Sequence, residues 1–293
     1  MNYAAIDIGS NAVRMMIASI NESENPVSYK KNTLIRIPLR LGDDAFIDRH
    51  LSEKKAGALL KTMNAFKHLM DLYKVSDYMA CATSAMREAA NGAEVIEEIK
   101  EKTGLEIRII DGETEAAMLY SGPIEAKLEK DKNYLYVDVG GGSTELSVLS
   151  GGGILASASF NIGTIRMLDN KDSEDTWKEM KAFIRINSRG LKNLSGIGTG
   201  GNINKLFKIS GEKDGNPLSY SQLKETYEYL RSYSLKERIK VLGLNQDRAD
   251  VIIPASEIYL TVMKWGGVKQ IYVPRKGLVD GIISSLIEKN FGK

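Results

Sequence analysis

One pattern of strand, acidic residue, glycine turn and returning strand occurs in each half of the chain. Residues 3–20 read YAAIDIGSNAVRMMIASI, and the second half contains YLYVDVGGGSTELSVLS. When the two stretches are aligned, Asp7 falls on Asp138 and Gly9 falls on Gly140. An internal repeat of this kind predicts that one structural unit has been duplicated. We therefore expect two related domains, which a chain of 293 residues can accommodate.

Helical segments separate the predicted strands, and this alternation predicts an α/β layered structure. Apolar residues at helical spacing predict a helix over 53–73, with Ser52 as its N-cap. Similar apolar spacing predicts a second helix over 174–194. Asn91 and Glu94 fit a variant of the capping box at the start of another helix.

The repeat also predicts how the chain is divided. We expect domain I to comprise residues 1–119 together with a terminal helix, residues 279–293, that returns to it. Domain II then comprises residues 120–278. Each domain should hold a mixed five-stranded sheet flanked by helices. If the two domains face each other, both glycine turns lie at one central cleft, and a hinge near Leu119–Pro123 would let that cleft open.

The glycine turn of the second half has the composition of a phosphate-binding loop. Gly140, Gly141 and Gly142 let the backbone turn tightly and bring its N–H groups close to an anion. Ser143 and Thr144 add hydroxyl donors. A plain hairpin turn is the alternative interpretation, but it would not need an acidic residue at the end of an apolar strand.

Carboxylates flank this loop and its counterpart. Asp138 ends the strand before the loop and Glu145 follows the loop, so their hard oxygens suit Mg²⁺ (or Mn²⁺). Asp7, the counterpart of Asp138, is a further candidate metal ligand. In the first turn, Ser10 and Asn11 can donate to phosphate oxygens, and a guanidinium such as that of Arg14 can bind a phosphate through two parallel hydrogen bonds.

The composition argues against several other functions. The 40 basic and 38 acidic side chains nearly balance, which argues against a protein that coats nucleic acid, although a local basic groove is still allowed. Cys81 is the single cysteine and cannot form an internal disulfide, so we expect a cytoplasmic protein. No apolar run approaches the ~20 residues that span a bilayer, so we expect no membrane association.

Histidine chemistry and the common nucleotide motifs are also unsupported. His50 and His68 are the only histidines, which is too few for a clustered zinc site and makes a carboxylate the expected general base. The chain lacks the GxxxxGK[ST] motif, and Gly198–Asn202 fits neither that motif nor GxGxxG. The paired glycine turns therefore remain the candidate phosphate-binding elements.

Both turns lie in longer motifs that resemble a known family. AIDIGSNAVRMMI and VDVGGGSTEL are similar to the two phosphate motifs of the Ppx/GppA phosphatases, within the actin/Hsp70/sugar-kinase superfamily. ATSAMREAANG, IIDGETEAAMLYSG, FNIGTIRM, IGTGGN, RADVIIPA and VPRKGLVDGII resemble other family segments, so the resemblance covers nearly the whole chain. It implies two duplicated actin-like (ribonuclease H-like) domains with a central cleft, in the short two-domain form of the family.

The resemblance assigns roles to individual residues. Glu115 matches the glutamate that the family uses as general base, and Arg87 matches the arginine that holds the substrate phosphate. Asp138 and Glu145 match the metal carboxylates, while Gly140, Gly141, Gly142, Ser143 and Thr144 match the phosphate-binding loop. The chain departs from the pattern at Thr114, which stands where the first glutamate of a pair is usual, and near Lys276 in the closing motif.

The resemblance implies an exopolyphosphatase that releases terminal orthophosphate from inorganic polyphosphate. Hydrolysis of guanosine pentaphosphate (pppGpp) is a close alternative because it would use the same atoms. An ATP-dependent phosphotransferase, with an adenosine pocket near Gly198–Asn202, and a non-catalytic nucleotide sensor also remain open. A homodimer is compatible with the resemblance, and no partner among nucleic-acid duplexes is expected.

A row of basic residues along the helix predicted at 174–194 has two interpretations. They are either a track for a long polyanion or a solvated helix face. The residues are Lys178, Lys181, Arg185, Arg189 and Lys192.

Overall fold

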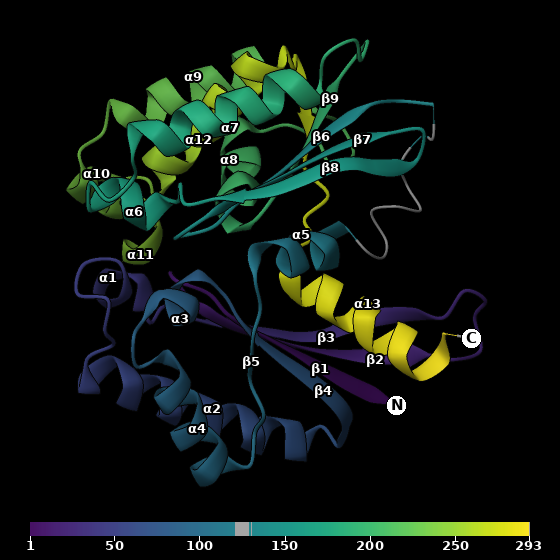
Figure 1. Cartoon of the computed structure of the whole chain (residues 1–293), viewed down its shortest axis with the longest axis vertical. Helices are drawn as coiled ribbons and strands as arrows, with labels where there is room; N and C mark the ends of the chain where they lie inside the picture. Colours follow the sequence, from purple (N-terminus) through teal and green to yellow (C-terminus); the bar gives the residue numbers. More distant parts are fainter. Residues whose placement is uncertain (121–128, 130, 293) are drawn as a thin grey trace. The chain divides into compact units, whose positions relative to one another are not determined.

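The computed structural model describes residues 1–120, 129 and 131–292. The chain forms two compact units, Met1–Gly122 with Leu278–Lys293, and Pro123–Gly277. Figure 1 shows the first unit in purple and blue, with the yellow terminal helix α13 (Leu278–Phe291) packed on it. The hinge expected near Leu119–Pro123 falls largely outside the described residues.

The first unit contains a mixed five-stranded sheet in the order β3-β2-β1-β4-β5. β1 pairs with β2 in antiparallel orientation and with β4 in parallel orientation. The five strands agree with the number expected for this unit. Their bounds are β1 (Asn2–Ile8), β2 (Val13–Asn21), β3 (Ser28–Ile37), β4 (Val75–Ala82) and β5 (Arg108–Ile109).

The second unit contains a six-stranded sheet in the order β10-β11-β9-β6-β7-β8, so the expectation of five strands was wrong here. The additional strand is β10, which has two residues and pairs at the sheet edge with β11. A strand this short has no periodicity to reveal it in the sequence. The bounds are β6 (Tyr134–Val139), β7 (Thr144–Ser150), β8 (Gly153–Phe160), β9 (Ser195–Thr199), β10 (Leu218–Ser219) and β11 (Gln270–Tyr272).

Strand register confirms the predicted duplication. β3-β2-β1-β4 and β8-β7-β6-β9 have the same order and the same pattern of antiparallel and parallel pairs. In β1 and β2, Asp7 lies opposite Arg14, and in β6 and β7, Asp138 lies opposite Glu145. The aligned residues of the repeat therefore occupy equivalent positions in two units that share this strand arrangement.

The two helix caps predicted in the first unit differ in outcome. Ser52 is the N-cap of α2, as predicted, and its hydroxyl accepts from the N–H of Lys55. Asn91 forms no side-chain cap on α4, because its side-chain amide binds the N–H and the carbonyl of Leu51 instead. The helices are α1 (Leu41–Ala45), α2 (Glu53–Leu72), α3 (Ser84–Glu88), α4 (Gly92–Thr103), α5 (Gly112–Tyr120) and α13.

In the second unit, α7 ends at Asn187, earlier than the predicted 194. The chain turns at Gly190, where φ is 83°. Leu191 and Leu194 still pack against the apolar core from the segment that follows, which explains why their spacing imitated a longer helix. The helices are α6 (Thr164–Leu168), α7 (Glu174–Asn187), α8 (Gly201–Ser210), α9 (Tyr220–Arg231), α10 (Leu235–Lys240), α11 (Gln246–Ala249) and α12 (Ile252–Gly266).

The terminal helix α13 completes the first unit. It contacts β1, β4 and α5. The buried carboxylate of Asp280 accepts from the hydroxyl of Tyr29 at 2.7 Å and pairs with the ammonium of Lys31 at 2.8 Å. Burial, followed by the charge of Asp280, raises the pKa of Tyr29, so the hydroxyl stays protonated as the donor. None of the helices in the described part of the chain is long and apolar enough to cross a membrane.

Candidate active site

The predicted residues of the first unit gather at one edge of its sheet. β1, β4 and β5 are parallel, so their carboxyl ends lie along the same edge. The N–H of Thr83, after β4, donates to the carbonyl of Ile8 at the end of β1, at 3.1 Å. Ser10 Oγ and Ser84 Oγ are 2.8 Å apart. This edge carries the candidate residues of the first half: Asp7, Ser10, Asn11, Arg14, Arg87 and Glu115.

Asp7 and Arg14 form an ion pair. Arg14 Nη1 lies 2.6 Å from Asp7 Oδ2, and the Asp7 side chain is 5% exposed while that of Arg14 is 30% exposed. The pairing follows from the register, which places the two residues opposite each other. A guanidinium has five N–H donors, so Arg14 can bind Asp7 and still reach an anion. Asp7, expected as a metal ligand, is bound to arginine.

Glu115 lies in the first turn of α5 and is buried. Asp111 precedes this helix, and its Oδ1 accepts from the N–H of Thr114 at 2.7 Å. The hydroxyl and N–H of Thr114 lower the pKa of Asp111. Thr114, where the family pattern has a glutamate, therefore stabilises the helix start that carries Glu115.

Asp7 and Glu115 both influence the buried thiol of Cys81. Burial, followed by the negative charges of Asp7 and Glu115 and opposed by Arg108, raises the pKa of Cys81 to about 12. The thiol is fully buried. The first unit therefore carries Asp7 and Glu115 at the sheet edge where the predicted phosphate-binding turn lies.

Arg87 connects the segments after β4 and β5. Its Nη1 donates to the carbonyl of Ile110 at 2.7 Å, directly before the start of α5. Its charge also contributes to the lowered pKa of Asp111. Because Arg87 is only partly buried, its guanidinium can contact a ligand while it holds this segment.

In the second unit, the glycine loop joins β6 to β7. The N–H of Gly140 donates to the carbonyl of Ser143 at 2.9 Å, which closes the turn. The hydroxyl of Thr144 is buried and donates to the carbonyl of Ile162 at 2.6 Å. A hydroxyl has one proton to donate. Thr144 therefore supports the loop in this conformation, and its hydroxyl proton is engaged within the unit.

Asp138 and Glu145 form a buried pair of carboxylates on one face of the sheet, because they lie directly opposite each other on β6 and β7. Asp138 Oδ1 accepts from the hydroxyl of Thr199 at 2.8 Å, and Glu145 Oε1 accepts from that of Ser159 at 2.9 Å. Two such carboxylates fit Mg²⁺, which commonly takes its remaining ligands from phosphate and water. Within residues 1–120, 129 and 131–292, no group of three or more His, Cys, Asp or Glu could hold a metal ion.

The turn after β9 supports Asp138, a role that the sequence analysis did not identify. Gly200 has φ 99°, and a Cβ there would lie 2.8 Å from Asp138 Oδ1. The hydroxyl of Tyr259 donates to the carbonyl of Thr199. Burial, followed by the charge of Asp138, raises the pKa of Tyr259 well above its ordinary value. The signal in the sequence was the IGTGGN run, whose glycine permits this close approach.

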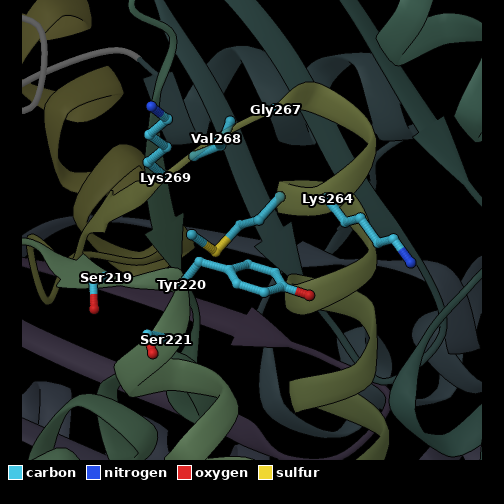
Figure 2. A pocket seen from close by; sticks show the side chains of 8 residues that line it. Ser219, Tyr220, Ser221, Lys264, Gly267, Val268 and Lys269 are labelled. Carbon is cyan, nitrogen blue, oxygen red and sulfur yellow. The ribbon is translucent and has the colours of Figure 1, made fainter.

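A pocket of about 570 Å³ lies elsewhere in the second unit (Figure 2). Tyr220 crosses its middle, with Lys264 and Lys269 on either side. Lys269 directly precedes β11, which is parallel to β9, as β9 is to β6. The pocket therefore lies at the amino ends of these strands, opposite the edge that carries the glycine loop, and none of the predicted site residues lines it.

Comparison with known proteins gives consistent matches along the chain. The Ppx/GppA phosphatase family profile matches residues 32–290. A Fusobacterium nucleatum protein named bifunctional 3-dehydroquinate synthase/phosphatase is 28% identical over 97% of this chain and 46% of its own length, so the chain spans about half of that relative. A Haemophilus influenzae protein, named provisionally as an exopolyphosphatase, is 26% identical over 98% of this chain and 92% of its own length.

Solved structures agree with these matches. The crystal structure of the Aquifex aeolicus member of the Ppx/GppA protein family has a TM-score of 0.78 and 26% sequence identity. That match covers 100% of this chain and 99% of the Aquifex chain. Since the family profile extends over most of the sequence and the duplicated fold agrees with it, the chain belongs to the Ppx/GppA phosphatase family.

Proposed function

We propose that this chain is an exopolyphosphatase, which removes terminal orthophosphate from inorganic polyphosphate by attack of water. The observation that carries the proposal is the buried Glu115 carboxylate, which lies at the same sheet edge as the Ser10 turn and Arg87. The family membership supports phosphatase chemistry, and the name of the Haemophilus relative supports the substrate.

In the proposed reaction, Glu115 accepts a proton from the attacking water. The water oxygen bonds to the terminal phosphorus as the bond from that phosphorus to the bridging oxygen breaks. The products are orthophosphate and a polyphosphate that is one unit shorter. A positioned carboxylate base of this kind typically accelerates such a step by about 10²–10⁴.

The substrate carries about one negative charge per phosphate, so phosphoryl transfer requires cations and N–H donors around it. In the first unit, Arg14 and Arg87 supply positive charge. In the second unit, the glycine loop supplies backbone N–H groups. A divalent cation held by Asp138 and Glu145 would neutralise further charge on the phosphates when bound.

Replacing the proposed base tests the mechanism. Glu115→Gln keeps the size of the side chain and removes its ability to accept a proton. We expect kcat for orthophosphate release to fall by about 10²–10⁴, with KM little changed. Glu113→Gln is the matched control, because Glu113 is an exposed residue of the same helical turn. A Glu115→Gln enzyme with the rate of the unmodified protein would show that another group is the base.

The substrate needs its own measurement, because pppGpp would use the same atoms. Orthophosphate release from tripolyphosphate, long polyphosphate and pppGpp should be compared with one enzyme preparation. We expect the highest kcat/KM with polyphosphate. A higher kcat/KM with pppGpp would replace the proposed substrate while leaving the role of Glu115 intact.

A further inference from the structure

Three consecutive carbonyl groups of the glycine loop point towards one short segment. The carbonyl of Gly140 accepts from the N–H of Thr164 at 3.1 Å, and that of Gly141 accepts from the N–H of Ile165 at 2.8 Å. The carbonyl of Gly142 accepts from Nε of Arg166 at 2.5 Å. The start of α6 therefore fixes the orientation of three peptide planes in succession.

This orientation determines where the N–H groups of the loop point. In a trans peptide, the carbonyl and the following N–H point in opposite directions. The N–H groups of Gly141, Gly142 and Ser143 are therefore directed away from α6. Within the part of the chain that the structure describes, none of these three N–H groups has an acceptor. Successive N–H groups that point outwards from a glycine turn form a site for an anion.

The close approach of α6 depends on a glycine. A Cβ at Gly163 would lie 2.4 Å from the carbonyl oxygen of Gly141 and 2.5 Å from the carbonyl carbon of Gly142. No larger residue fits there unless α6 moves away from the loop. Such a movement would lengthen the hydrogen bonds of Thr164, Ile165 and Arg166 to the loop.

The third carbonyl differs from the first two because a side chain holds it. Backbone N–H groups bind the carbonyls of Gly140 and Gly141, whereas that of Gly142 is bound by the guanidinium of Arg166, which is 6% exposed. Glycine has little steric restriction on rotation of its peptide plane. Without this hydrogen bond, the carbonyl of Gly142 can turn towards the anion, where its negative end repels phosphate.

We propose that Arg166 is a positioning residue, which holds the Gly142–Ser143 peptide so that the N–H of Ser143 donates to a phosphate oxygen. This inference rests on the proposed function, because it assumes that the loop binds a polyphosphate. Arg166 acts from behind the loop and does not itself touch the substrate. Its segment, FNIGTIRM, resembled the family without an assigned role.

Binding of tripolyphosphate, measured by titration calorimetry, separates this role from catalysis. The Glu115→Gln protein serves as the parent, because it should bind without turnover. Adding Arg166→Ala should raise the Kd for tripolyphosphate by about 10- to 100-fold, which is the factor expected for loss of a hydrogen bond to a charged group. Arg166→Lys retains a cation and a donor, so it should recover part of the affinity.

Arg238→Ala in the same parent is the matched control. Arg238 also binds backbone carbonyls of the second unit, those of Tyr233 and Ala249, and neither of them belongs to the glycine loop. Both alanine variants should lower the Tm, and only Arg166→Ala should change the Kd. If Arg166→Ala does not fold, Arg166→Lys and Gly163→Ala must show the raised Kd for tripolyphosphate.

The outcomes distinguish the two proposals. If the parent binds tripolyphosphate and folded Arg166 variants bind it equally well, the positioning role is wrong and the proposed function stands. If the parent binds no tripolyphosphate, both proposals are wrong. In the enzyme that keeps Glu115, Arg166→Ala should raise KM and leave the pH profile of kcat unchanged. A change of the base would instead alter that pH profile.

Discussion

Cys81 lies beside Asp7 in the first sheet, because the two residues are register partners on β4 and β1. Its side chain has no exposed surface. Burial, together with the negative charges of Asp7 and Glu115, raises the pKa of the thiol from 9.0 to about 12, so the neutral form is favoured. The state of this single thiol therefore reports whether the acidic site around it is intact.

We predict that Cys81 resists alkylation while the protein is folded. At pH 9, on the order of half or more of the thiol is ionised in the unfolded chain, whereas on the order of one thiol in a thousand is ionised in the folded protein. Iodoacetamide labelling, followed by mass spectrometry, should be slow in buffer and rapid in denaturant. Equal rates in both conditions would contradict the buried, neutral thiol.

At the residue scale, the sequence named candidate side chains on both turns and did not predict their partners. The repeat identified Asp7 and Arg14 as counterparts of Asp138 and Glu145. It did not show that Arg14 binds Asp7, because the register of the two strands depends on the geometry of the turn, which the sequence alone did not give. Likewise, the hydroxyl of Thr144 suggested a phosphate donor until its contact with Ile162 was visible.

At the scale of elements, the position of α5 depends on how closely α13 packs against it. A Cβ at Gly281 of α13 would lie 1.9 Å from the carbonyl oxygen of Met118, which is in the helix that carries Glu115. Backbone cannot move aside as a flexible side chain can. A residue larger than glycine at this position must therefore displace α5.

We predict that Gly281→Ala impairs both stability and activity. Overpacking of this kind typically costs about 1–3 kcal/mol of unfolding free energy. A displacement of Glu115 by ~1 Å should lower kcat by about 10²-fold. Thermal unfolding and orthophosphate release are the two measurements. Gly57→Ala in α2 is the control, because a Cβ there has no atom within 4 Å and alanine favours a helix.

The outcome that would contradict this argument is a Gly281→Ala enzyme with unchanged Tm and kcat.

Contacts between elements that are distant in the sequence also explain why one of the two predicted helix caps did not form. Ser52 was predicted as a cap because the signal is local, and it is confirmed. Asn91 had the same local signal, yet its amide binds Leu51, which is distant in sequence.

At the scale of the whole molecule, duplication was the most predictable property. Two short motifs were sufficient to predict two related units, because the alignment of Asp7 with Asp138 reflects equivalent strand registers. The additional strand β10 and the early end of α7 could not be predicted, since each depends on packing that local periodicity does not record.

We predict that the basic side chains on and after α7 affect long substrates selectively. Lys178 pairs with Asp175, and Lys181 lies over the ring of Trp265, 5.5 Å from its centroid. Arg185 and Arg189 are exposed, and neither has an ionic partner among the residues that the structure describes. Reversing both charges, Arg185→Glu with Arg189→Glu, should raise the KM for long polyphosphate and leave that for tripolyphosphate unchanged. If the double substitution changes the KM for both substrate lengths equally, these side chains are a solvated helix face and not a track for long polyphosphate.

The return of α13 to the first unit has a consequence for synthesis of the protein. Asp280, which binds Tyr29 and Lys31, is translated after the entire second unit. On the ribosome, residues 123–277 can fold as one continuous stretch, while β1 and α5 still lack the helix that covers them. The first unit is therefore completed only after the second unit has been synthesised, and the carboxylate proposed as the base reaches its final surroundings only once α13 has been translated.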